Sequence, residues 1–245
     1  MLATTMNDES PENPIRQQLA AIGDRINAAC HRAGRQPEEV TLIGVSKTFP
    51  AAVVQLGIEA GLRALGENRV QETADKIAQL ASVAALAGVT WHLIGHLQSN
   101  KVRRAIELFG MIHSVDSLKL AERISLICGE MGRRMPILLE VNLGGESSKS
   151  GATEDEALSL CESISKLPHV VLCGLMTVPP YLDNPQDVRP YFRRLRMLRD
   201  EARRLGIVGP EFTNLSMGMS HDFEVAIEEG ATFVRIGTSI FGTRA

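Results

Sequence analysis

The sequence predicts a single (β/α)8 barrel, or TIM barrel, with an extra N-terminal helix. Three observations predict this α/β fold. A short β-rich run, a loop and an amphipathic helix follow one another repeatedly through eight β-rich runs, and such alternation is typical of a parallel sheet with right-handed crossovers. The length of 245 residues suits one barrel of this kind. No linker rich in Pro, Gly or Ser divides the chain.

The N-terminal segment is polar and acidic, and it lacks the basic and apolar regions of a signal peptide. We expect residues 1–14 to be a disordered leader and residues 15–245 to form the barrel domain. From Ile15 to Gly34 the apolar residues recur at helical spacing, and the stretch closes on a glycine. This pattern predicts the extra helix.

Eight short runs rich in β-forming residues are predicted as the barrel strands: Thr41–Ser46, Ala64–Gly66, Trp91–Gly95, Met111–Val115, Ile137–Asn142, Val171–Met176, Phe212–Met217 and Phe233–Gly237. Amphipathic stretches predict the helices between them at residues 50–60, 69–87, 98–107, 117–132, 153–166, 186–205 and 221–229. An open, doubly wound sheet is the alternative. Its usual sign, a GxGxxG motif after the first strand, is missing.

Composition excludes several classes of protein. The net charge of −3 offers no basic field for nucleic acid or an acidic membrane. No apolar run approaches the roughly 20 residues of a membrane span. The four cysteines are scattered without a CxxC pair, which argues against a disulfide framework or a zinc site and fits a reducing cytoplasm.

Lys47 is the most prominent candidate for chemistry. It follows the apolar run Leu42–Val45, so its stem would emerge from a packed strand at the end of the barrel where function is found. A partly buried lysine loses its proton more readily, and a neutral amine can form a Schiff base with an aldehyde. The alternative is a solvated lysine at a strand end.

Two turns rich in small and hydroxyl residues follow the last two predicted strands. Ser216–Ser220 follows the seventh, and Ile236–Ser239, which contains Gly237 and Thr238, follows the eighth. Barrels often bind phosphate at this place, although glycine and serine also serve ordinary turns. Arg235 lies two residues before Gly237 and so shares its face of the strand. It could point inward beside a bound ring or form a surface salt bridge.

Other motifs do not support a site. His92 and His96 are four residues apart, but they lie at a strand end and no glutamate follows His92, so the metalloprotease pattern is absent and no metal site is predicted. The glycine-rich stretch at 144–151 resembles a P-loop, but no glycine precedes Lys149.

Seven ordered motifs closely resemble those of the pyridoxal phosphate homeostasis proteins. They are Val45–Thr48, Gly66–Arg69, Trp91–Lys101, Ser148–Gly151, Gly174–Met176, Ser216–Ser220 and Val234–Thr238. The resemblance covers roughly residues 15 to 242. It implies a barrel like the N-terminal domain of alanine racemase, without the second domain of that enzyme.

The resemblance also implies a cofactor and its contacts. Pyridoxal 5'-phosphate would be held as a Schiff base on Lys47, its phosphate would lie at Ser216, Gly237 and Thr238, and Arg235 would lie near the pyridine nitrogen. Asn68 is a further polar contact. Such proteins are associated with buffering or delivering the free cofactor and with amino-acid and keto-acid balance, so no residue is assigned a catalytic role. Apo-enzymes that use the cofactor are candidate partners, and we expect a monomer or a weak dimer.

A second hypothesis is an amino-acid racemase that uses pyridoxal phosphate. The alanine racemase reaction needs a base on each face of the reacting carbon, and Lys47 could serve one face. This chain has only Tyr181 and Tyr191, and neither falls at a predicted strand end. Arg235 beside the pyridine nitrogen would leave that nitrogen unprotonated and weaken the electron sink. These points favour a carrier.

Overall fold

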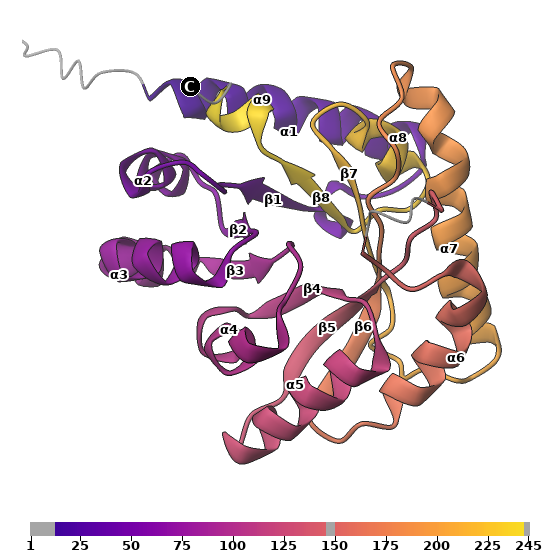
Figure 1. Cartoon of the computed structure of the whole chain (residues 1–245). Coiled ribbons are helices and arrows are strands. Elements are labelled where there is room, and N and C mark those ends of the chain that lie inside the picture. The colour runs from indigo at the N-terminus through magenta and orange to yellow at the C-terminus, as the bar shows by residue number, and fades with distance from the viewer. Residues whose placement is uncertain (1–12, 146–149, 243–245) are drawn as a thin grey trace, which may run out of the picture.

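A computed structural model describes residues 13–145 and 150–242. Eight parallel strands form a closed barrel in which each strand pairs with the next along the chain and β8 pairs with β1 (Figure 1). The strands are β1 (Thr41–Val45), β2 (Ala64–Glu67), β3 (Thr90–Leu93), β4 (Met111–Val115), β5 (Met135–Glu140), β6 (Val170–Met176), β7 (Asn214–Met219) and β8 (Phe233–Ile236). The closed sheet confirms the predicted (β/α)8 barrel and excludes the open sheet.

Helices surround the barrel (Figure 1). They are α1 (Pro14–Arg32), α2 (Ala51–Glu59), α3 (Val70–Ala87), α4 (Val102–Leu108), α5 (Leu118–Glu130), α6 (Glu154–Ser165), α7 (Arg189–Arg204), α8 (Phe223–Glu228) and α9 (Thr238–Phe241). Short 3-10 turns, η1 (Pro37–Glu39), η2 (Ser99–Lys101) and η3 (Pro185–Val188), precede β1, α4 and α7. The predicted helices 98–107 and 186–205 therefore each begin with a 3-10 turn. No helix within the described ranges has the length and hydrophobicity to cross a membrane.

The N-terminal helix completes the outer ring of helices. Up to residue 242, the segment after β8 forms the short α9, and α1 packs against α8, α9 and α2 beside it (Figure 1). Arg25 of α1 bonds to Glu224 at 2.8 Å and lies over the Phe223 ring, 4.5 Å from its centroid. The buried face of α1 includes Ile22 and Ile26. The predicted extra helix is present, and it closes the barrel domain.

The first described helix begins one residue before the predicted start of the barrel domain at residue 15. Asn13 accepts a hydrogen bond from the Ile15 backbone N–H, and Pro14 is the first residue of α1. Proline suits this position because its fixed φ matches the helix and its missing N–H would have no partner there. The predicted leader up to residue 12 lies outside the described residues.

The seventh strand runs two residues further along the chain than the prediction Phe212–Met217. The register of β7 against β8 shifts between the pairs Ser216–Phe233 and Met219–Arg235. Gly218 lies within this irregularity at φ +89°, a conformation that side chains disfavour. The strand ends at Met219, two residues beyond the predicted end at Met217, which changes the residues at the barrel mouth.

Candidate functional site at the carboxyl ends of the strands

Four of the six predicted cofactor contacts, Lys47, Asn68, Gly237 and Thr238, lie at the carboxyl ends of three neighbouring strands, β8, β1 and β2. Val45 of β1 pairs with Gly66 of β2, so Lys47 and Asn68 each lie two residues beyond a paired position. Gly44 pairs with Ile236 of β8, which places Gly237 and Thr238 beside the same end of β1. Lys47 therefore lies between Asn68 on one side and the turn after β8 on the other.

The backbone around Lys47 forms a strained turn. The Phe49 N–H donates to the Ser46 carbonyl at 3.1 Å, which closes a β-turn with Lys47 and Thr48 at its centre. Thr48 has φ 69°, the left-handed conformation, and it is the sole non-glycine with positive φ among the described residues. A β-branched residue there is an outlier that costs roughly 1–3 kcal/mol and persists only when its surroundings hold it.

A buried ionic cluster lies directly beneath this turn. The Lys76 ammonium donates to the Ser46 carbonyl and Glu67 Oε1, both at 2.7 Å, and to Glu72 Oε1 at 2.9 Å. Ser46 Oγ also donates to Glu67 Oε1 at 2.7 Å, and the Thr48 N–H donates to Glu72 Oε1 at 2.7 Å. Sequence reasoning missed this cluster, because a lysine on an amphipathic helix is ordinarily solvated.

The two carboxyl groups of this ionic cluster titrate in opposite directions. Burial raises the pKa of Glu67 despite its bonds from Lys76 and Ser46, and its Oε2 atom is buried without a hydrogen-bond partner among the described residues. The pKa of Glu72 is lowered overall. Partial burial by itself would raise it, but the bonds from Lys76 and the Thr48 N–H outweigh that effect. Of the two carboxyl groups, Glu72 is thus the one whose charged form is favoured beside the turn.

Ser216 does not lie at the mouth of the barrel. It is level with Phe233, two residues deeper than Arg235, and it is fully buried. Arg235 donates to Ser216 Oγ at 2.7 Å, and His113 Nδ1 lies 2.9 Å from the same oxygen. The hydroxyl is thus occupied inside the barrel, and the geometry opposes the predicted phosphate contact at Ser216.

Ser220, rather than Ser216, lies beside the turn after β8. It follows the end of β7, it is half-buried, and its Oγ accepts a 3.3 Å bond from the Gly237 N–H. Thr238, the next residue, is exposed at the same mouth. Ser220, Gly237 and Thr238 therefore lie together. Both Ser216 and Ser220 belong to the motif that carries the resemblance, and the resemblance implied a phosphate contact at Ser216; the structure places Ser220 beside Gly237.

Arg235 belongs to a hydrogen-bonded chain through the barrel interior. Its second terminal nitrogen donates to the Thr177 carbonyl at 2.9 Å, and the chain continues from Ser216 through His113 to His92, whose Nδ1 lies 3.0 Å from His113 Nε2. A guanidinium can only donate, so the Ser216 hydroxyl accepts from Arg235 and keeps its own proton available to donate to His113 Nδ1; in that order His113 Nε2 donates to His92 Nδ1. This order requires both imidazoles to be neutral.

Burial keeps these imidazoles neutral. It lowers the pKa of His92 to about 4. Burial also lowers the pKa of His113 well below its ordinary value, with a further contribution from the charges of His92 and Arg235. Arg235 is itself buried, which lowers its pKa to about 10, partly offset by the charges of Glu140 and Asp222. It therefore remains a cation at neutral pH.

We expect His92 to make the fold sensitive to acid. Below the unfolded pKa of about 6.5 the unfolded chain binds a proton that the folded chain refuses until about pH 4, so the contribution of His92 to stability falls with pH. The loss amounts to about 2 kcal/mol between about pH 7 and about pH 5. Urea unfolding of wild type and His92→Gln at both pH values measures this loss. We expect the free energy of unfolding of wild type, relative to that of His92→Gln, to be smaller at the lower pH.

The comparison between variants is necessary because Glu140 acts in the opposite sense. Burial raises the pKa of Glu140 to about 7, partly offset by Arg235, so its contribution to stability grows as pH falls through 7. Glu140 is common to both proteins and cancels in the difference. His31→Gln, a change at an exposed histidine of α1, is the control. A stability difference that stays constant with pH would contradict the neutral chain.

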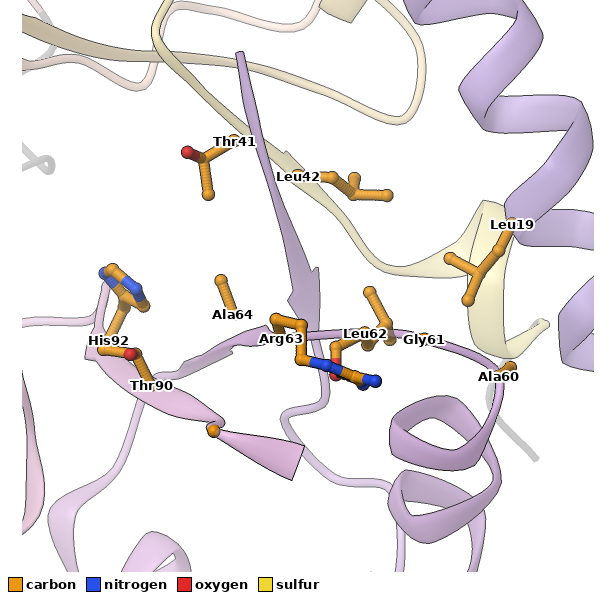
Figure 2. A pocket seen from close by; sticks show the side chains of 11 residues that line it. Leu19, Thr41, Leu42, Ala60, Gly61, Leu62, Arg63, Ala64, Thr90 and His92 are labelled. Carbon is orange, nitrogen blue, oxygen red and sulfur yellow. Dashed lines mark hydrogen bonds between the residues drawn. The ribbon is translucent and has the colours of Figure 1, made fainter. Parts of the chain in front are cut away.

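A hollow of about 530 Å³ lies at the opposite end of the barrel from Lys47 (Figure 2). It is lined by the first residues of three strands, Thr41, Ala64 and Thr90, together with Leu19 of α1 and His92. None of the predicted cofactor contacts borders it. At the mouth, a hollow of about 430 Å³ adjoins Asn68, and a smaller one of about 220 Å³ adjoins Glu140. No described group of three His, Cys, Asp or Glu residues is arranged to hold a metal ion.

One tyrosine lies closer to the mouth than sequence reasoning expected. The Tyr181 ring packs against His221, the residue after Ser220, at 5.0 Å between centroids. Its side chain is 72% exposed. His221 is held by the carbonyls of Leu182 and Asp183, at 3.2 and 3.1 Å. As predicted, neither tyrosine lies at the end of a strand. The loop after β6 nevertheless brings Tyr181 to the rim of the barrel.

Comparison with known proteins places the chain in a family. The family model for the N-terminal domain of alanine racemase matches residues 17–245. The chain is 47% identical to the pyridoxal phosphate homeostasis protein of Aquifex aeolicus over 228 residues, which cover 93% of this chain and 97% of that protein. The corresponding protein of Escherichia coli K12 is 40% identical, over 95% of this chain and 97% of its own length.

Solved structures agree with this assignment. PipY of Synechococcus elongatus, in a crystal structure with pyridoxal phosphate bound, is 39% identical and superposes with a TM-score of 0.81 over 93% of this chain and 100% of its own. An alanine racemase of Clostridium difficile, 17% identical with a TM-score of 0.69, shares the fold over 57% of its length and 95% of this chain. The chain therefore belongs to the pyridoxal phosphate homeostasis protein family, whose barrel is that of the alanine racemase N-terminal domain.

Proposed function

We propose that this protein binds pyridoxal 5'-phosphate at the carboxyl face of the barrel and buffers or delivers it within the cytoplasm. One observation carries the proposal: Lys47 lies between Asn68 and the cluster of Ser220, Gly237 and Thr238 on neighbouring strand ends. A nucleophilic amine beside hydroxyl and backbone donors is the set that an aldehyde with a phosphate requires. Relatives named for homeostasis of this cofactor support the same reading.

The residues at this face fit the cofactor. Lys47 would hold it through a Schiff base: the neutral amine bonds to the aldehyde carbon, and one water molecule is released. Ser220, Thr238 and the Gly237 N–H would hold the phosphate. A Cβ at Gly237 would lie 3.2 Å from the Val45 carbonyl oxygen, so this backbone packs closely against the end of β1. Glycine is the residue that best allows such an approach.

Arg235 would lie near the pyridine nitrogen and keep it unprotonated. Its guanidinium is held by Ser216 and Thr177, and a guanidinium offers donors only. When bound, pyridoxal phosphate supplies the aldehyde and an electron sink, and the protein decides how far that sink is used. A nitrogen that receives a hydrogen bond instead of a proton is a weaker sink, which suits a carrier.

Apo-enzymes that use pyridoxal phosphate are the proposed recipients. Many such enzymes interconvert amino acids and keto acids, so a change in cofactor supply would alter that balance. We expect the carrier to be a monomer or a weak dimer. All four cysteines are free and buried, as suits a reducing compartment.

A comparison of three vitamers tests the proposed function. Pyridoxal phosphate carries both the aldehyde and the phosphate, pyridoxal lacks the phosphate, and pyridoxamine phosphate lacks the aldehyde. We expect pyridoxal phosphate to bind at least about ten-fold more tightly than either, because each charge-assisted hydrogen bond contributes roughly 1.5–3 kcal/mol and the Schiff base adds a covalent bond. Equilibrium dialysis measures the three affinities. Equal affinities would refute the site.

We expect no efficient amino-acid racemase activity. Tyr181 lies at the rim, but its ring is exposed and packs against His221. A missing second base removes a factor of about 10²–10⁴. Deuterium exchange at Cα of L-amino acids in D2O, with Lys47→Ala and Tyr181→Phe as controls, measures it. Exchange with inversion at about 1 s⁻¹ or faster that depends on Lys47 would identify an enzyme instead.

A further inference from the structure

We propose that Lys76 is a positioning residue for Lys47: together with Glu67 and Glu72 it holds the turn that carries the reactive amine, and it thereby controls how fast the cofactor is taken up and released. The inference rests on the proposed function and deepens it. It concerns a residue on α3 with no place among the predicted cofactor contacts.

The burial of Lys76 needs an explanation. The residue is 5% exposed. A buried ammonium is costly unless it is paired and hydrogen-bonded. Lys76 meets that condition with three acceptors, all within 2.9 Å, and one of them is the main-chain carbonyl of Ser46. A lysine that served only solubility would extend into water, as residues on the exposed face of α3 do.

The contacts of Lys76 reach the chain on both sides of Lys47. On the preceding side, the ammonium bonds directly to the Ser46 carbonyl, and Glu67 accepts the Ser46 hydroxyl. On the following side, Glu72 joins the ammonium to the Thr48 N–H. The residue between these anchors is Lys47, so the anchors hold the backbone on both sides of its Cα.

The conformation of Thr48 provides independent support. Its φ of 69° is unfavourable for a β-branched residue, and glycine would adopt it freely. Beside the Phe49–Ser46 bond that closes the turn, the bond from the Thr48 N–H to Glu72 Oε1 opposes relaxation of Thr48 itself. Since Glu72 is in turn held by Lys76 through an i,i+4 ion pair, loss of the ammonium would loosen the strained turn.

A fixed turn affects the rate of bond formation. The amine must approach the aldehyde carbon along a narrow range of directions, and positioning of reacting groups supplies a large part of rate enhancement. A loosened turn would spread the Lys47 amine over more orientations. Uptake and release would both slow relative to simple phosphate binding, because the phosphate contacts lie on β7 and β8 and do not involve Lys76.

Three variants test the role of Lys76. Lys76→Met removes the ammonium and keeps most of the stem. Because it leaves Glu67 buried without its partner, the double variant Glu67→Gln with Lys76→Met provides a neutral cluster that is more apt to fold. Glu72→Gln weakens only the bond to Thr48 and the ion pair. Asp75→Asn, on an exposed neighbour in α3, is the matched control.

Two measurements are combined. Stopped-flow absorbance of full-length protein mixed with pyridoxal phosphate measures the rate of bond formation to Lys47 as a function of pH. We expect a slowing of about ten-fold or more for Lys76→Met and its double variant and of about three-fold for Glu72→Gln, with phosphate affinity unchanged. Amide hydrogen exchange of the cofactor-free protein follows the peptide that spans 46–50. It should accelerate in the same variants, while the β5 peptide does not change.

The outcomes separate this inference from the proposed function. If wild type forms no borohydride-stable product on Lys47, the proposed function fails. If wild type forms it and a folded Lys76→Met or double variant forms it at the wild-type rate, with unchanged exchange at 46–50, the positioning role is refuted. If Lys76→Met does not fold, the double variant and Glu72→Gln decide by the same criteria.

Discussion

Replacement of Lys47 by alanine is expected to abolish covalent attachment of pyridoxal phosphate while the barrel remains folded. Lys47 lies in the centre of a solvent-facing turn, it is half-buried, and it belongs to neither buried hydrophobic cluster. The turn itself is held by the bond from Lys76 to the Ser46 carbonyl, the bond from the Thr48 N–H to Glu72 and the bond from the Phe49 N–H to the Ser46 carbonyl. Its loss therefore removes the nucleophile and leaves the scaffold.

Borohydride reduction followed by peptide mass analysis measures the attachment. Wild type should carry the cofactor mass on the peptide containing Lys47, and Lys47→Ala should carry none. Lys101→Ala is the matched control, since Lys101 is an exposed lysine after β3 at the same end of the barrel. Cofactor mass on another lysine in wild type would refute the assignment, and thermal unfolding of both variants verifies that the fold is retained.

The second large effect concerns the phosphate. Ser220→Ala with Thr238→Val is expected to weaken cofactor retention about a hundred-fold, because each change removes a hydroxyl donor and hydrogen bonds to charged groups contribute roughly 1.5–3 kcal/mol each. Each single variant should lose about ten-fold. Equilibrium dialysis measures retention, and the Lys47→Ala background isolates phosphate binding from the covalent bond.

Ser216→Ala provides the discriminating comparison. Its hydroxyl receives the Arg235 guanidinium and contacts His113 Nδ1 inside the barrel. Its removal leaves buried groups without a partner, which costs about 1–3 kcal/mol of unfolding free energy. We expect this variant to lose stability in urea and to retain the cofactor better than Ser220→Ala. A large loss of affinity at Ser216 with none at Ser220 and Thr238 would restore the assignment made from the motif alone.

Much of the barrel could be predicted from the sequence because its signals are local. Each β-rich run is followed by a helix at the expected spacing, and the predicted bounds of β4 agree with the structure. Lys47, Asn68, Gly237 and Thr238 follow strand ends, so placing the strands places these residues. The helix limits at 98–107 and 186–205 were less accurate, since the 3-10 turns that begin them depend on how each loop packs.

Two features of the site could not be read along the chain. The position of Ser220 depends on the irregular register between β7 and β8, which is set by hydrogen bonds between residues about 17 positions apart. The role of Lys76 depends on α3 packing so that its ammonium reaches the Ser46 carbonyl, 30 residues away in sequence. Neither the position of Ser220 nor the contact between Lys76 and Ser46 can be predicted from spacing along the sequence.

The sequence by itself determined the fold class, the family and the strand ends at which the candidate residues lie, because periodicity and motif order are properties of the chain alone. Only the tertiary structure decided which serine lies at the mouth, why Lys76 is buried, and how His92, His113, Ser216 and Arg235 form one chain inside the barrel. The physical reason is closure. When eight strands form a ring, the register of each pair decides which side chains share a layer, and that register is set by contacts between distant segments.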